Sequence, residues 1–276
     1  MICTRKFAFT IGVFASTLLL TSPGAAAPDG ALIARARAAL ARGDGIAAQA
    51  DLQRLQHQGA ARDTLAAAMG EALIQQGERQ DAREWLEKET FATSDQLYGY
   101  RMLGLLERLD GNLGAAGRAY DKALKIAPRD AQLWVDIGRL RYAGGEQLLA
   151  IAAAEQAVEL GPENVRALEF RAQLVRDQFG LDAALPWFEA ALARAPNDPE
   201  LLAQYAATLG DLGRAKDMLV VTRKLVEVSP RHPMGYLLQA SLAARAGQTN
   251  LARAIMSRAG NRLRGRPAAI MLQGAL

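Results

Sequence analysis

The sequence predicts an all-α fold, an α-solenoid of about seven 34-residue helix-turn-helix units. Three sets of residues carry this prediction, because each recurs with a period of 34, and that period is typical of a two-helix repeat. The prolines are Pro128, Pro162, Pro196 and Pro230. The glycines are Gly43, Gly77, Gly111, Gly145, Gly213 and Gly247. The small residues are Ala48, Ala82, Ala116, Ala150, Ala184 and Ala252.

Each class of recurring residue has a physical role in such a unit. About a dozen residues with helical apolar periodicity are followed by a turn and another dozen, as an antiparallel helix pair requires. The glycine ends the first helix, because it enters the left-handed conformation at little steric cost. The proline ends the second helix, because it lacks an N–H group. Since no unit can bury its own apolar faces, neighbouring units must stack.

The unit at residues 131–164 resembles the tetratricopeptide repeat (TPR). Its matching residues are Trp134, Ile137, Gly138, Ala150, Ala157 and Pro162. The preceding unit matches through Tyr100, Leu103, Gly104, Ala116, Tyr120, Ala123 and Pro128. The resemblance implies a right-handed superhelix. In this frame, seven units run over residues 29–266, and residues 267–276 form a partial eighth unit or a C-terminal capping helix.

Residues 1–26 have the pattern of a Sec-type signal peptide. Arg5 and Lys6 precede an uncharged apolar run at residues 7–20, and small residues follow at 24–27. As a helix this run would be about 21 Å long, short of a bilayer core of about 30 Å, so an N-terminal membrane anchor is the less favoured interpretation. We therefore expect a periplasmic or secreted protein.

Several function classes are disfavoured by composition. The formal charge of +4 falls to +2 without residues 1–26, and no dense basic run with interleaved aromatics occurs, so no nucleic-acid partner is expected. The only histidines, His57 and His232, have no Cys, Asp or second His at metal-ligand spacing. No glycine-rich phosphate loop is found. We predict neither metal, cofactor nor catalytic site, and hence no enzyme.

Resemblance to the TPR family implies a partner-binding groove. We number the 34 places of each unit from its first residue, so that residue 131 is place one of its unit. In that family, places two, five, nine and twelve, all on the first helix, face the concave side. The groove residues expected here are Arg37, Tyr98, Arg101, Arg108, Arg139, Tyr142, Arg166 and Arg176. Arginine pairs bidentately with carboxylates, and tyrosine offers rigid contact area with a polar tip, so the partner would be an acidic or extended segment of another protein. The alternative is that these arginines lie on solvated helix faces.

The carboxylate-clamp subset of the family requires asparagine at place six of successive units. These places hold Ala68, Met102, Asp136 and Phe170. Binding of a C-terminal carboxylate by such a clamp is therefore not expected.

The last ten residues include four large apolar side chains, although a solenoid normally ends in a polar cap. These are Ile270, Met271, Leu272 and Leu276. They could leave an apolar edge for a partner or for self-association, or they could form a short helix buried against the seventh unit. The sequence thus favours a non-catalytic binding scaffold of the cell envelope. The alternative is a structural subunit of an envelope secretion or polysaccharide-export assembly that docks through this end.

Overall fold

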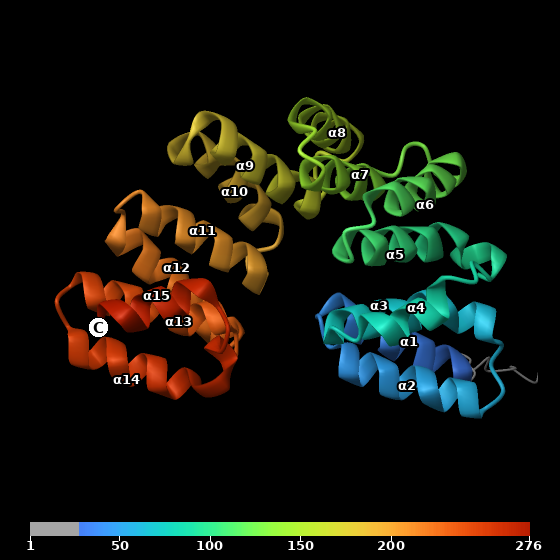
Figure 1. Ribbon diagram of the computed structural model, residues 1–276, viewed down its shortest axis with the longest axis horizontal. Coiled ribbons are helices and arrows are strands. Elements are labelled where there is room, and N and C mark those ends of the chain that lie inside the picture. Colours follow the sequence, from blue (N-terminus) through green and yellow to red (C-terminus); the bar gives the residue numbers. More distant parts are fainter. Residues whose placement is uncertain (1–27) are drawn as a thin grey trace, which may run out of the picture.

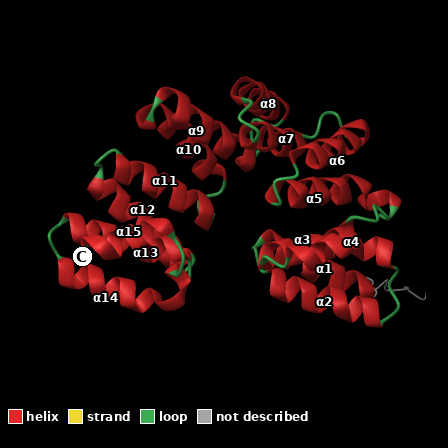
Figure 2. Ribbon diagram, in the orientation of Figure 1, coloured by secondary structure: helices red, strands yellow, loops and turns green. Residues whose placement is uncertain are grey.

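The computed structural model of the protein describes residues 28–276. The predicted signal peptide lies outside the described residues. Within them the chain forms fifteen α-helices and two short 3₁₀ helices, joined by turns and loops without strands (Figure 2). The predicted all-α solenoid is confirmed.

Helices alternate between the first and the second position of each unit. The first helices are α1 (Pro28–Ala41), α3 (Arg62–Gln76), α5 (Gln96–Leu109), α7 (Ala131–Ala143), α9 (Val165–Phe179), α11 (Pro199–Asp211) and α13 (Pro233–Arg245). The second helices are α2 (Gly45–His57), α4 (Arg79–Leu86), α6 (Leu113–Ile126), α8 (Gln147–Leu160), α10 (Leu181–Arg194), α12 (Ala215–Val228) and α14 (Thr249–Ala259). The 3₁₀ helices are η1 (Thr93–Asp95) and η2 (Gly260–Leu263), and α15 (Pro267–Ala275) follows.

The helix pairs stack into an arch, with α1–α4 at one end and α13–α15 at the other (Figure 1). At the top of the arch, α5 and α7 lie on its inner side and α6 and α8 on its outer side (Figure 1). First helices pack on the first helix of the next unit, as α5 does on α7. Second helices also pack on the following first helix, as α6 does on α7. Each unit thus contributes its apolar faces to a core shared with its neighbours.

Turns and close helix contacts explain the recurring small residues. Gly77 ends α3 in the left-handed region at φ 83°, where a side chain would be strained. Gly104 and Gly138 have a different role, because each lies against an aromatic ring. A Cβ atom at Gly104 would lie 2.3 Å from Cε1 of Tyr120, and one at Gly138 would lie 2.5 Å from Cε1 of Phe170.

Second helices in the later units end two residues before the recurring proline, as α8 does at Leu160 before Pro162. Three of the first helices that follow, α7, α9 and α11, begin with a side-chain cap. The Asp130 carboxylate accepts a hydrogen bond from the Leu133 N–H at 2.6 Å, and the Asp198 carboxylate accepts one from the Leu201 N–H at 3.0 Å. These caps fix where α7 and α11 begin.

The second unit departs from this pattern. Its helix α4 has only eight residues and is followed by a connection without helix at residues 87–92. Phe91 in this connection is buried and lies edge-on to Tyr100, with ring centroids 5.5 Å apart. A side chain of this connection therefore packs on α5.

Only part of α15 is buried. Ala269 is buried, and Leu272 and Leu276 pack partly into the cluster formed with α13 and α14. Ile270 and Met271 are 59% and 76% exposed. The helix therefore adds to the core of the last pair and also presents an apolar edge to solvent.

Candidate functional site

The eight side chains predicted for the groove all lie on first helices, and several connect one first helix to the next. Arg101 Nε of α5 lies 2.7 Å from Asp136 Oδ2 of α7. Arg139 of α7 lies 3.7 Å from Glu169 of α9. Arg166 of α9 lies 2.6 Å from Asp198, the cap of α11. We call this row of polar contacts between consecutive units the first-helix ladder.

Tyrosines extend the ladder. The Tyr98 hydroxyl of α5 donates a hydrogen bond to Glu71 of α3, and the Tyr142 hydroxyl of α7 donates one to Asp177 of α9 at 2.6 Å. Gln204 of α11 donates to Glu169 at 2.7 Å, so α9 is linked to its neighbours on both sides. The ladder therefore runs without interruption from α3 to α11.

Three predicted arginines lie at the margins of the ladder. Arg37 of α1 pairs with Asp95 of η1 at 3.4 Å, and Arg176 of α9 pairs with the adjacent Asp177 at 3.3 Å. Arg108 differs, because its Nε is buried and has no hydrogen-bond partner among the described residues.

Burial and pairing set the charge states of the ladder. Burial raises the pKa of Asp136 even though the Arg101 guanidinium opposes the shift. Burial and the Glu71 carboxylate raise the pKa of Tyr98 far above its usual value, so its hydroxyl stays a neutral donor. The ladder is consequently a set of satisfied donors and acceptors with both signs of charge.

The acids of the ladder are Glu71, Asp95, Asp136, Glu169, Asp177 and Asp198. The repeat frame puts Glu169 on the groove, as place five of the fifth unit, but the other five acids were not predicted from the sequence. A signal was available, because several contacts join residues that are 35 positions apart, one repeat plus one residue. These include Arg101 with Asp136, Tyr142 with Asp177 and Glu169 with Gln204. A search for complementary polar residues at that spacing would have paired them.

The predicted arginines differ in how accessible their side chains are to a partner. The side chains of Arg37, Arg166 and Arg139 are 59%, 39% and 32% exposed, whereas that of Arg101 is 19% exposed. A partner carboxylate must compete with an acid already in place. It meets the least competition at Arg139, whose ion pair is the longest of the ladder.

Comparison with known proteins identifies the family. The tetratricopeptide repeat family model matches residues 68–131 and 135–199, which include α5 to α10 apart from residues 132–134. This chain contains tetratricopeptide repeats. The fold of this TPR chain indicates a scaffold for protein–protein interaction.

Relatives of the TPR chain are known from sequence and from structure. It is 31% identical over 173 residues to a TPR repeat-containing protein of Synechococcus elongatus, covering 59% of this chain and 42% of that protein. It is 30% identical over 99 residues to the human tetratricopeptide repeat protein 7B, covering 36% of this chain and 12% of that protein. The TPR chain therefore spans less than half the length of either relative.

Among solved structures, a tetratricopeptide repeat protein from Parabacteroides merdae superposes with a TM-score of 0.60. The superposition covers 90% of this chain and 98% of that one at 17% sequence identity. This similarity supports the fold of the TPR chain.

Two further features of the TPR chain concern metal binding and the membrane. Among residues 28–276, no group of three or more His, Cys, Asp and Glu side chains is arranged to hold a metal ion. None of the helices described is both long enough and apolar enough to span a membrane.

Proposed function

We propose that this TPR chain is a non-catalytic scaffold of the cell envelope that binds a segment of another protein along the first-helix ladder. The observation that carries the proposal is the continuity of the ladder from α3 to α11. Its side chains are held in place by one another, so little side-chain entropy is lost when a partner binds. An extended segment laid across these helices meets carboxylates and guanidinium groups in alternation.

The ion pairs of the ladder limit which of its arginines can bind an acidic partner. Arginines paired with acids attract a carboxylate less than free arginines do, because the net charge of each pair is small. The best anchors for an acidic residue are Arg139, with its long ion pair, and Arg108, a half-buried side chain that forms no ion pair with any described residue. We propose that the segment places a carboxylate near these two residues and a donor near Glu169.

Placement in the envelope rests on the pattern of residues 1–26, with its cationic start, its apolar run and its small residues. An exported scaffold would meet periplasmic or secreted partners.

Site-specific crosslinking tests the binding surface. A photoreactive residue replaces Tyr142, which lies on the ladder, and in a second variant replaces Lys88, which is exposed beyond the end of α4. We expect one protein to be captured in living cells from position 142 and not from position 88. The Arg139→Gln substitution in the same background should lower that capture. Equal capture from both positions would contradict binding at the ladder.

The apolar edge of α15 supports a second candidate, a structural subunit that docks through its C-terminal end. Ile270 and Met271 are both largely exposed there. In this case the substitutions Ile270→Lys and Met271→Lys should abolish assembly while Arg139→Gln has no effect. Sedimentation velocity of the same variants reports whether the edge binds a second copy.

A further inference from the structure

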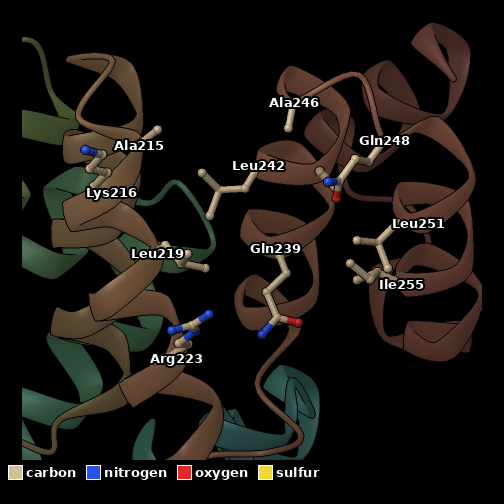
Figure 3. A pocket seen from close by; sticks show the side chains of 11 residues that line it. Ala215, Lys216, Leu219, Arg223, Gln239, Leu242, Ala246, Gln248, Leu251 and Ile255 are labelled. Carbon is tan, nitrogen blue, oxygen red and sulfur yellow. The ribbon is translucent and has the colours of Figure 1, made fainter.

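An open groove lies between α12 and α14, with α13 as its floor. Its volume is about 510 Å³. Leu219 of α12, Leu242 of α13 and the pair Leu251 and Ile255 of α14 point into it, with Arg223 and Gln239 at one end (Figure 3). Leu219 and Leu251 are 37% and 49% exposed, so the apolar walls are accessible to solvent. We call this the α12–α14 groove.

Corresponding positions at the two preceding junctions are filled by a long side chain of the first helix. Tyr205 of α11 donates a hydrogen bond to Glu189 of α10 at 2.9 Å. One repeat earlier, Arg171 of α9 pairs with Glu155 of α8 at 3.1 Å and also lies over the ring of Trp187.

At the α12–α14 groove the corresponding polar pair between the first and the second helix is missing. The residues 34 positions after Tyr205 and Glu189 are Gln239 and Arg223, and neither forms a side-chain hydrogen bond or an ion pair within the described part of the chain. Leu212 is likewise replaced by Ala246, which has a smaller side chain. The groove therefore lies where the sequence differs from that of the preceding junctions at the positions that form the polar pair.

Charge sets this part of the molecule apart. Residues 213–276 contain eleven Lys and Arg and two acids, a formal charge of +9, whereas residues 28–212 contain 20 Lys and Arg and 27 acids, a formal charge of −7. Lys216 and Arg223 on the α12 wall form no ion pair with any described residue. Unlike the ladder arginines, these cations are free to bind an anion.

We propose that the α12–α14 groove binds an amphipathic helix of a partner protein, with aliphatic side chains on one face and carboxylates along its edge. Two helical walls over a helical floor provide the shape into which a further helix packs. Aliphatic side chains of the partner would cover Leu219, Leu251 and Ile255, and its carboxylates would pair with Lys216 and Arg223. The site is separate from the first-helix ladder, so it does not depend on the function proposed above.

Fluorescence anisotropy with a defined probe tests this site. The probe is a labelled peptide of about 18 residues, about five helical turns, held helical by a staple, with leucines along one face and glutamates on both sides. The decisive variant is Arg223→Glu with Gln239→Tyr, because it reproduces the Glu189–Tyr205 pair that closes the preceding junction. The control is Arg231→Glu, which changes the charge equally at an exposed position outside the groove.

We expect the double variant to bind the probe at least about tenfold more weakly, a change that corresponds to about 1.4 kcal/mol, and the control to bind it as the wild type does. A probe with lysine in place of glutamate should bind the wild type at least about tenfold more weakly as well. Thermal unfolding shows whether the double variant is folded. If it is not, Ala246→Leu fills the same groove with a single substitution.

Equal binding to wild type and to the folded groove-filled variant would overturn the proposal. Equal binding of the lysine probe would overturn the acidic character of the partner. A dimer of the wild type that dissociates in the groove-filled variant would show that a second copy occupies the groove, and would overturn the partner helix.

Discussion

At the scale of single residues, Gly104 shows how closely the two helices of a unit approach. A methyl group there would lie 2.3 Å from the Tyr120 ring, and Tyr120 is only 2% exposed, so the ring has little room to move. We expect Gly104→Ala to lower the free energy of unfolding by about 1–3 kcal/mol, as overpacking of a core does. Urea denaturation of wild type and variant measures this change.

Gly117 provides the matched control, because it lies within α6 and a methyl group there would meet Leu140 at an ordinary 3.9 Å. Gly117→Ala should raise the free energy of unfolding by about 0.5–1 kcal/mol, since alanine favours a helix interior. If both alanine variants shifted stability in the same direction, the steric explanation of Gly104 would be wrong.

The positions of such glycines can be predicted from the sequence, but the side chains that they contact cannot. Gly104 and Gly138 are the residues that match the TPR pattern at the same place in two successive units. Gly104 accommodates Tyr120 of its own unit, whereas Gly138 accommodates Phe170 of the next unit. The period is the same in both cases, so only the packed structure distinguishes them.

At the scale of elements, the short helix α4 is joined to α5 by a partly buried ion-pair network. Arg83 of α4 lies 2.6 Å from Glu107 and 2.7 Å from Asp110 at the end of α5. The Arg83 hydrogen bond holds the pKa of Glu107 below its usual 4.5, outweighing the opposite effect of burial. The folded chain therefore releases the Glu107 proton more readily than the unfolded chain does.

From this shift follows a pH-dependent contribution to stability. It is fully present above the unfolded pKa of Glu107 and is lost as the pH falls through the lowered folded pKa. At pH 7, Glu107→Gln should lower the free energy of unfolding by about 1.5–3 kcal/mol, and the difference from wild type should shrink as the pH falls below about 4.5. Denaturation curves over a pH series measure it.

Glu84→Gln is the control for this prediction. Glu84 is exposed on α4, the helix that carries Arg83, and it lies outside the Arg83 network. A pH-independent loss in Glu107→Gln, or an equal loss in Glu84→Gln, would contradict the assignment.

Helix positions followed from the period and the turn residues, but two element-level features did not. The short α4 is followed by a contact of Phe91 with Tyr100, two residues that the repeat frame does not relate. The α12–α14 groove depends on side chains being too short or wrongly charged to close a junction. The pattern that identifies a repeat marks the residues that units share, so it passes over such differences.

At the scale of the whole molecule, the stack of units should respond locally to damage at one end. Deleting residues 267–276 removes Ala269 and Leu272 from their contact with α13 and α14. Because each unit contacts only its neighbours, amide hydrogen exchange should become faster in α13 and α14 and stay unchanged in α5 to α8. Mass spectrometry of peptic fragments resolves these regions.

The variant Ile270→Lys with Met271→Lys is the control, since both side chains are already exposed. It should exchange as the wild type does. Faster exchange throughout the deletion variant would mean that the array unfolds as a single cooperative unit.

The first-helix ladder also bears on how such a chain can evolve. If such an array lost or gained one whole unit, the constant period of 34 would keep the helices in register. The ladder does not survive it, because Arg101 needs Asp136 and Tyr142 needs Asp177 in the unit that follows. A chain that lost its fourth unit would keep its backbone geometry but place Arg101 opposite Phe170, which cannot accept its hydrogen bond. Each unit therefore depends on its particular neighbour in the array. We expect the order of the units to be kept during evolution.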